Sequence, residues 1–330
     1  MMDKQIPKET MLEMYWRMLL ARQFDERAWV LLRQEVIGYH LSGIGHEAIQ
    51  VGLAYALERN HDWVVPYYRD LALLLALGLT PREYMLGLLG KKDDPVSGGR
   101  QLPNHWSLKR ANVVSGSSVL GAQSAHAAGI ALGIKLRGES QVVLTTAGEG
   151  ATAMGDWYEA INWAAVHRLP VVFVVENNRY AISSVQGAQM AVPNVADKAQ
   201  GLGLPGVTVN GMDFLAVHRV ALEAVGRARK GDGPTLIEAT TYRIPPHSSD
   251  DDDRAYRSQA DVAEGRKRDP LPFARNYLEK QSLLTPEINT QLEQKAREIV
   301  DDAVRFAQGA PEPTPASAAY PVYAEDRDYA

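Results

Sequence analysis

Hydrophobic and polar residues follow two different patterns along the chain. Toward the N-terminus, apolar residues recur at near-helical spacing among charged ones, which predicts a helical segment over about residues 8–60. These apolar residues are Leu12, Trp16, Leu19, Phe24 and Leu31. From about residue 118, small apolar stretches typical of buried helices alternate with short β-branched runs typical of buried strands. This alternation predicts an α/β fold, with a mostly parallel central sheet and helices on both faces.

The expected elements of the sheet region follow one another closely. They are helices over residues 118–136, 156–167 and 213–229 and strands over 141–147, 170–175 and 235–242, after an earlier helix over 48–58. Asp156 and Asp213 are the expected N-caps of two of these helices, because a short side-chain oxygen can accept from the first free N–H groups. Ligands in such sheets bind at the carboxyl ends of the strands.

The C-terminal part of the chain is predicted to be helical over about residues 260–310. Thr285 and Pro286 begin an amphipathic helix. Its expected buried face consists of Ile288, Leu292, Ala296, Ile299, Ala303 and Phe306. Length and composition fit a single domain over residues 1–310, followed by an extended tail over residues 311–330 that is rich in proline and alanine.

Composition narrows the classes of protein to consider. The 330 residues are 45% hydrophobic, which is enough for a large buried core. The formal net charge of −5 gives no basic footprint, so nucleic acid is not an expected partner. There is no cysteine, which excludes disulfides, a thiol nucleophile and a cysteine-based zinc site. The most apolar run, residues 71–79, is far shorter than the roughly 20 residues that span a bilayer, and we expect a soluble cytoplasmic protein without membrane association.

Two short motifs stand at the ends of successive predicted strands. Gly148-Glu149-Gly150 follows one strand and Asn177-Asn178 follows the next. Either motif alone is more typical of an ordinary turn, but their arrangement after neighbouring strands favours a shared site. Glu149 offers a carboxylate and Asn178 an amide oxygen, which are the hard ligands that Mg²⁺ prefers, and the glycines allow a diphosphate to approach the backbone.

His247 is the other candidate for chemistry. It follows two prolines and precedes two serines and the acidic run Asp250–Asp253. On composition alone it is typically a solvated loop histidine. A metal site shared with the aspartates is a further hypothesis, although adjacent aspartates cannot all face one ion without strain. His46 is expected to pack or hydrogen-bond within the fold, and His105 is a weaker candidate.

These motifs resemble the thiamine-diphosphate motif of the transketolase-like superfamily, in which GEG and NN flank a helix and a strand. More closely, residues from about Met11 to Phe306 resemble the α subunit of the E1 component of 2-oxo acid dehydrogenase complexes. The shared motifs are GHEAIQVG from Gly45, PYYRD from Pro66, GRQLPNHW from Gly99, GAQ from Gly121, ENNRYAIS from Glu176 and TYRIPPHSSDDD from Thr241. The resemblance implies a thiamine-diphosphate-binding fold.

The resemblance also implies a set of metal ligands. Glu149, Asn178 and the main-chain oxygen of Tyr180 would hold Mg²⁺, and Gly150 would lie against the cofactor. Many relatives have aspartate where this chain has Glu149. Both side chains are hard carboxylates, so we expect metal binding to survive with a slightly different geometry.

Further positions match the family's cofactor and substrate contacts. Tyr68 and Arg69 would contact the diphosphate, for which the planar fork of arginine is well suited. The backbone at Ser118 and Leu120 would meet the aminopyrimidine ring. Tyr39 matches an aromatic position at the substrate pocket, where Tyr68 is also expected.

In the resembling family a histidine at the position of His247 faces the cofactor and helps in proton and acyl transfer, as an imidazole titrating near neutrality can. Several relatives have glycine where this chain has Pro246, which should stiffen the loop. The serines around His247 resemble a loop that is phosphorylated in mitochondrial relatives.

The reaction that the resemblance implies is decarboxylation of a 2-oxo acid followed by transfer of the acyl group to the lipoyl group of the E2 acyltransferase. In this family a second chain, the β subunit, carries the glutamate that activates the cofactor. We therefore expect a heterotetramer of two α and two β chains, with this chain inactive alone.

The runs TYRI and HSSDDDD, together with GRQLPNHW, favour a branched-chain substrate such as 2-oxoisovalerate. Pyruvate is the first alternative and acetoin the second. Two other classes are a non-catalytic scaffold subunit and a nucleotide-dependent dehydrogenase, although no G-x-G-x-x-G follows a strand in the required context.

Overall fold

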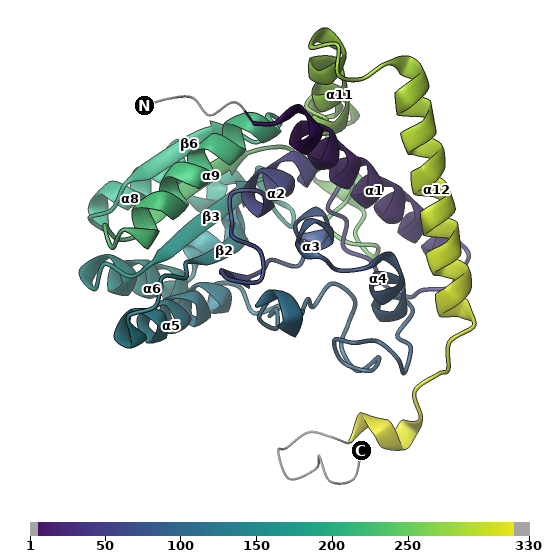
Figure 1. Ribbon diagram of the computed structural model, residues 1–330, viewed down its shortest axis with the longest axis horizontal. Helices are drawn as coiled ribbons and strands as arrows, with labels where there is room; N and C mark the ends of the chain where they lie inside the picture. The colour runs from purple at the N-terminus through teal and green to yellow at the C-terminus, as the bar shows by residue number, and fades with distance from the viewer. Residues whose placement is uncertain (1–5, 320–330) are drawn as a thin grey trace.

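The computed structural model describes residues 6–319 and is built around one five-stranded sheet (Figure 1). The strands are β1 (Trp63–Val65), β2 (Val143–Gly148), β3 (Val171–Asn177), β6 (Gly206–Asn210) and β7 (Thr235–Thr240). They lie in the order β1-β2-β3-β7-β6, and every pairing between neighbours is parallel. The predicted α/β fold with a parallel central sheet is therefore confirmed.

Helices cover both faces of the sheet, as expected for strands buried on two sides. Successive side chains of β3 point to opposite faces: Val172 and Val174 join one apolar core, and Val171, Phe173 and Val175 join the other. The first core lies under α2 (Glu47–Ala54) and α9 (Phe214–Arg229), and the second lies under α5 (Ala122–Arg137) and α6 (Gly155–Val166). Figure 1 shows the two layers on either side of the strands.

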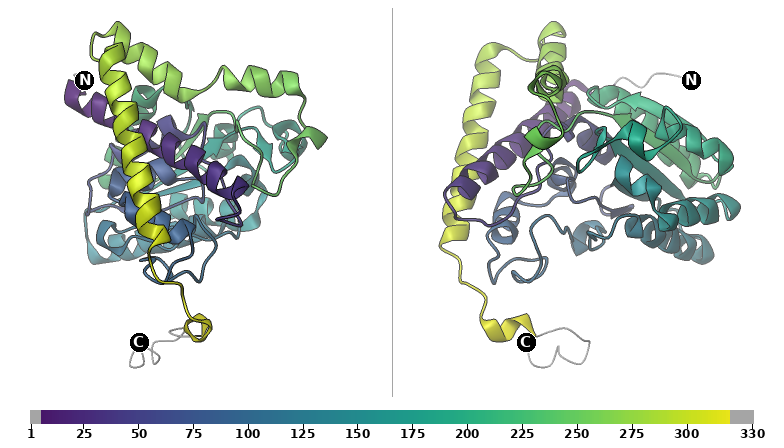
Figure 2. Two further views of the ribbon diagram at one scale, coloured as in Figure 1. Left: turned by 90° about the vertical axis from the view of Figure 1, so that its right-hand side faces the viewer. Right: turned by 180° about the vertical axis from the view of Figure 1, so that it is seen from behind.

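The N-terminal and C-terminal helices form an outer layer on the first face. They are α1 (Lys8–Arg33), α3 (Leu71–Leu77), α4 (Pro81–Leu88), α10 (Gln259–Arg266), α11 (Pro270–Lys280) and α12 (Pro286–Gln308). The long helix α12 packs along α1 and α4, so segments from the two ends of the chain lie side by side (Figure 2). Within residues 6–319 no helix combines the length and the apolar character needed to cross a membrane.

The remaining elements are short. They are α7 (Gln186–Gln189), α8 (Lys198–Gly201), the hairpin strands β4 (Tyr180–Ala181) and β5 (Ser184–Val185), and the 3₁₀ turns η1 (Lys109–Ala111), η2 (Glu149–Ala153), η3 (Val195–Asp197), η4 (Asp253–Ala255) and η5 (Pro315–Ala318). The hairpin directly follows β3 and brings its backbone beside η2, at the carboxyl end of the sheet.

Several predicted boundaries are wrong. The helix expected from Ser118 begins at Ala122, because Gly121 turns the chain with φ at 88°. The helix expected to reach Glu58 ends at Ala54. The prediction that Asp156 is an N-cap is wrong. The helix α6 begins at Gly155, one residue earlier, so Asp156 lies within the first turn of the helix and does not cap it. The expected cap at Asp213 is confirmed, since its side chain accepts from two N–H groups of the first turn of α9.

The expected buried face of α12 is confirmed at its centre, where Ala296 and Ala303 are buried and Leu292 and Ile299 pack against the core, but it is wrong at both ends. Ile288 and Phe306 are 41% and 43% exposed. Val300 and Val304 are buried in their place, and so is Asn289, whose Oδ1 accepts from the Tyr15 hydroxyl at 2.6 Å. The difference arises because α12 packs on helices α1 and α4 rather than on the sheet. The expected extended tail contains the short turn η5, and its last residues, 320–330, lie outside the described part of the chain.

Candidate functional site

A cavity of about 300 Å³ opens at the carboxyl ends of β2 and β3. Residues from distant parts of the sequence converge on it, because parallel strands present all their carboxyl ends at one edge. The lining includes Tyr39, Tyr68, Arg69, Ser118, Leu120, Glu149, Gly150, Tyr180 and His247, which are all residues that the sequence singled out. Asn178 lies directly behind this lining, where its main-chain N–H donates to Glu149 Oε2 at 3.2 Å.

The Gly148–Gly150 turn forms the floor of the cavity. Glu149 is buried, and its Oε1 has no hydrogen-bond partner, so burial raises the pKa of this carboxyl. The turn tolerates no side chains beside Glu149. A Cβ at Gly148 would lie 2.9 Å from the Tyr67 hydroxyl, and one at Gly150 would lie 2.7 Å from the Cβ of Ala181. The floor therefore combines an exposed backbone with one unmatched acceptor oxygen.

Asn178 and Tyr180 are connected to Glu149 by hydrogen bonds of the backbone that follows β3. Asn178 Oδ1 accepts from the Tyr180 N–H at 3.2 Å, and the Tyr180 carbonyl accepts from Arg243 Nη1 at 3.2 Å. The structure thus brings the three sequence-predicted metal ligands together. Among residues 6–319 no three histidine, cysteine, aspartate or glutamate side chains cluster so as to hold a metal ion, so a cation here would meet one carboxylate and neutral oxygens.

The hypothesis of a metal site between His247 and the aspartate run is wrong. Asp251 accepts from the main-chain N–H of His247 at 2.8 Å and so caps the loop rather than facing an ion with the imidazole. Asp252 and Asp253 form ion pairs with Arg254 and Arg257. The aspartates of the acidic run therefore already have hydrogen-bond or ion-pair partners within their own loop.

Arg69 fixes the position of His247. The Arg69 Nη2 group donates to His247 Nδ1 at 3.1 Å and to its main-chain oxygen at 2.8 Å. Because an arginine nitrogen can only donate, Nδ1 must accept, and the proton of the neutral imidazole resides on Nε2. Burial, followed by the positive charges of Arg69 and Arg243, lowers the pKa of His247 to about 4. The imidazole is consequently neutral at physiological pH, rather than titrating near neutrality as expected.

The other contacts of Arg69 nearly exhaust its five N–H donors. Nη1 donates to the Ser42 carbonyl at 2.6 Å and Nε donates to the Tyr67 hydroxyl at 3.3 Å. Together with the two bonds to His247, these leave about one donor free. A bidentate contact with a phosphate therefore requires Arg69 to exchange at least one of its present partners.

Two buried arginines that the sequence reasoning did not single out hold the loop of His247. Arg243 donates to the Ile182 carbonyl at 2.7 Å and so ties this loop to the β4–β5 hairpin. Arg257 donates to the Pro245 carbonyl at 3.0 Å and also to the carbonyl of Arg243. Arg243 lies in the run TYRI and Arg257 follows the acidic run, but the sequence does not mark either arginine as buried.

The wall formed by residues 118–120 is the exposed side of the cavity. Val119 is 64% exposed and Leu120 is 37% exposed. Ser118 Oγ hydrogen-bonds to His105 Nε2, which gives His105 a place beside the cavity. Apolar side chains remain in contact with solvent at this rim of the described chain.

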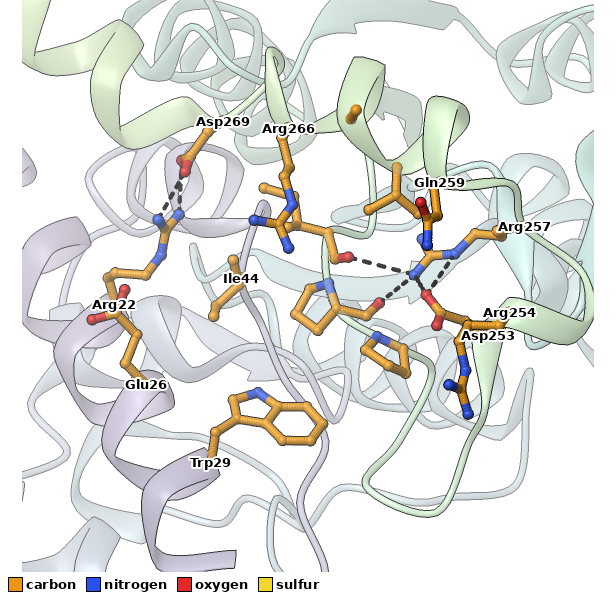
Figure 3. A pocket seen from close by; sticks show the side chains of 15 residues that line it. Arg22, Glu26, Trp29, Ile44, Asp253, Arg254, Arg257, Gln259, Arg266 and Asp269 are labelled. Atoms are coloured by element: carbon orange, nitrogen blue, oxygen red, sulfur yellow. Dashed lines mark hydrogen bonds and ion pairs between the residues drawn. The ribbon is translucent and has the colours of Figure 1, made fainter. Parts of the chain in front are cut away.

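A second, larger cavity of about 840 Å³ lies between α1, α10 and the loop after β7 (Figure 3). Ion pairs between Arg22 and Asp269 and between Arg257 and Asp253 line it. Of the residues that the sequence selected for chemistry, Asp253 lines this cavity, where it is paired with Arg257, and the predicted cofactor and substrate residues other than Asn178 line the smaller one. Arg257 connects the two cavities, because its side chain lines the larger one while its guanidinium holds the backbone that leads to His247.

Comparisons with known proteins agree with this geometry. The sequence profile described as "Dehydrogenase E1 component" matches residues 15–316. The chain is 47% identical over 313 residues to the 2-oxoisovalerate dehydrogenase subunit alpha of Bacillus subtilis, covering 95% of each chain. It is 38% identical over 300 residues to a pyruvate dehydrogenase E1 component subunit alpha of Staphylococcus aureus, covering 91% of this chain and 78% of that one. The chain therefore belongs to the dehydrogenase E1 component family.

Proposed function

We propose that this chain is the α subunit of a thiamine-diphosphate-dependent E1 enzyme that decarboxylates branched-chain 2-oxo acids. The observation that carries the proposal is the unpartnered carboxylate oxygen of Glu149 in a cavity that also holds Arg69 and His247. The family to which the chain belongs is thiamine-diphosphate-dependent. The similarity to a 2-oxoisovalerate dehydrogenase subunit, which extends over 95% of each chain at 47% identity, supports the choice of substrate class.

The residues present fit a metal–diphosphate group. Mg²⁺ would take Glu149 Oε1, Asn178 Oδ1 and the Tyr180 carbonyl, because hard oxygen ligands suit this ion and the glutamate oxygen now lacks a partner. The glycines on either side of Glu149 let the turn pack closely against Tyr67 and Ala181, since a side chain at either position would collide with one of them. The positively charged guanidinium group of Arg69 would face the diphosphate.

When bound, thiamine diphosphate supplies the electron sink for the carbanion left by loss of CO₂. The contribution of this chain is to bind the charged end of the cofactor and to hold a proton at His247 Nε2. Burial and the charge of Arg69 lower the pKa of that imidazole and so keep it neutral, and the hydrogen bond from Arg69 to Nδ1 leaves the proton on Nε2, beside the cavity. Tyr39 and Tyr68, which line the same space, would contact the substrate side chain.

The proposal includes a β subunit and the lipoyl group of an E2 acyltransferase. The pyrimidine end of the cofactor would lie beside the wall at Ser118 and Leu120, where exposed apolar side chains support coverage by another chain. Within residues 6–319, no carboxylate lines the cavity other than that of Glu149, which faces the diphosphate end. A glutamate that activates the pyrimidine would therefore come from the β chain.

Steady-state kinetics of the purified assembly of α and β chains test the substrate. We expect a higher kcat/KM for 2-oxoisovalerate than for pyruvate. The S. aureus relative is named for pyruvate dehydrogenase, which makes pyruvate the specific alternative. A higher kcat/KM for pyruvate would refute the branched-chain preference while leaving the thiamine-dependent decarboxylase in place. Activity lost on dialysis against chelator and restored by Mg²⁺ tests the metal.

A further inference from the structure

A buried carboxylate, imidazole and amide form a chain behind the candidate metal site. Glu176 Oε2 lies 2.6 Å from His46 Nδ1, and His46 Nε2 lies 3.5 Å from Asn178 Nδ2. All three side chains are buried, with at most 2% of their surface exposed. His46 directly precedes α2, Glu176 lies near the end of β3 and Asn178 directly follows that strand, so the hydrogen bonds connect segments that are 130 residues apart in the sequence.

The hydrogen bonds determine which nitrogen of His46 carries the proton. Gln50 Oε1 accepts from the Ala72 N–H at 3.0 Å, which leaves Gln50 Nε2 to donate to Glu176 Oε2 at 3.3 Å. Glu176 Oε2 is therefore an acceptor, and His46 Nδ1–H donates to it. In a neutral imidazole, Nε2 is then the acceptor, and it accepts a hydrogen bond from the Asn178 amide N–H.

The same contacts decide the orientation of the Asn178 amide. Its NH₂ group faces His46, and its Oδ1 accepts from the Tyr180 N–H at 3.2 Å. That leaves one lone pair of Oδ1 for a cation beside Glu149. If the amide were turned over, two N–H donors would face both the Tyr180 N–H and the cation. The orientation of Asn178 thus matters more here than at an exposed asparagine.

We propose that His46 is a positioning residue that holds the Asn178 amide with its oxygen toward the metal site, and that Glu176 in turn fixes the tautomer of His46. The inference rests on the proposed function, because it presumes that Asn178 is a metal ligand. It extends to an amide the principle by which a carboxylate orients a histidine ligand behind a bound metal. His46 has no contact with the cavity itself.

The test measures binding of thiamine diphosphate to the assembly of α and β chains by calorimetric titration, over a range of Mg²⁺ concentrations. His46→Asn keeps a donor for Glu176 but is too short to reach Asn178, so the carboxylate stays partnered while the amide is released. His46→Gln has the reach for both contacts. His218→Leu is the matched control, since His218 is a half-buried histidine of α9 that hydrogen-bonds to the Gly52 carbonyl.

At limiting Mg²⁺ we expect His46→Asn to raise the Kd of the cofactor by about 10- to 100-fold, the usual effect of removing a residue that orients a metal ligand. The difference should narrow as Mg²⁺ approaches saturation. His46→Gln and His218→Leu should stay close to wild type. Thermal melting without cofactor checks that each variant is folded, and His46→Gln keeps the test usable if His46→Asn is not.

A second background separates positioning from a general structural effect. In Asn178→Asp the two oxygens of the ligand are equivalent, so no amide has to be oriented. The penalty of His46→Asn should be much smaller in this background than in wild type. An equal penalty in both backgrounds, or weakening that does not depend on Mg²⁺, would overturn the positioning role. If wild-type binding itself proves independent of Mg²⁺, the metal part of the proposed function fails and this inference fails with it.

Discussion

Replacing Glu149 by glutamine should make the cofactor-free protein more stable and at the same time abolish its response to Mg²⁺ and thiamine diphosphate. The Oε1 atom of the Glu149 carboxylate is buried and has no hydrogen-bond partner, and burial raises the pKa of this carboxyl. A buried acceptor left without a hydrogen bond costs about 1–3 kcal/mol, and a charged one costs more. Glutamine has the same shape without the charge.

The glutamine amide can keep the contact with the Asn178 N–H, although its second polar group still lacks a partner. We therefore expect a net gain of only about 1 kcal/mol in the free energy of unfolding, which is part of the penalty above. For a chain of this length that gain corresponds to a rise in Tm of about 2 °C.

Ligand binding should reverse the order of the two proteins. A ligand at 100 times its Kd stabilises the folded state by about 2.7 kcal/mol, which exceeds the gain from the substitution. Wild type should therefore melt above Glu149→Gln when Mg²⁺ and thiamine diphosphate are present, and below it when they are absent. Differential scanning calorimetry of the assembly of α and β chains with and without ligands measures both. Glu159→Gln, at an exposed position on α6, is the control.

Two results would refute this reasoning. A cofactor-free variant that melts below wild type would mean that Glu149 is satisfied in the protein and has a structural role. An equal ligand-induced shift in both proteins would mean that Glu149 does not hold the metal.

Four further predictions follow from the same contacts. Gly150→Ala places a Cβ 2.7 Å from that of Ala181, so it should cost about 1–3 kcal/mol of stability and weaken cofactor binding. In the same melting and titration experiments, Gly129→Ala on the exposed face of α5 should be neutral or stabilising. Because the pKa of His247 is lowered to about 4, kcat/KM of the assembly should stay flat from pH 8 to about 5 and fall only below that; a fall centred near 6.5 would contradict the buried neutral imidazole. Burial lowers the pKa of His46 to about 3, so the stability that the neutral imidazole contributes is complete above the unfolded pKa of 6.5. As pH falls below 6.5, this contribution should be lost by about 1.4 kcal/mol per pH unit. Denaturation of wild type and of His46→Gln at several pH values measures that slope. Arg257→Met leaves the carbonyl of Pro245 and the carboxylate of Asp253 without their partner, which should cost about 3–5 kcal/mol and speed hydrogen exchange in residues 244–250, while Arg254→Met at the surface should do neither.

The sequence was sufficient to predict the three inner strands of the sheet, β2, β3 and β7, and the meeting of Glu149 with Asn178. Both residues follow buried strands, and the pairing of β2 with β3 in register, Gly148 opposite Glu176, brings the two turns to one edge. Local chemistry also predicted the cap at Asp213 and the start of α12 at Thr285 and Pro286, because the capping oxygen and the N–H groups lie within one helical turn. Predictions that depend on neighbours in sequence or on adjacent parallel strands were the most accurate.

Contacts between distant segments could not be predicted in the same way. Nothing near His46 indicates that it meets Glu176, which is 130 positions later. The helix α12 does have an apolar face, but the sequence does not indicate which helix packs on that face. Ile288 was therefore wrongly assigned to the interior. Strand β6 was missed because it lies at the edge of the sheet, begins with glycine and is half exposed.

Under the proposed function, this chain carries the metal–diphosphate half of a decarboxylase site that is completed by another subunit. Adding purified β chain stepwise to a fixed amount of this chain, with thiamine diphosphate, Mg²⁺ and 2-oxoisovalerate, measures that claim directly through CO₂ release. We predict no turnover by either chain alone, activity that rises until the chains are equimolar, and loss of that activity in Glu149→Gln. Turnover by this chain alone, or full activity of Glu149→Gln in the assembly, would contradict the claim.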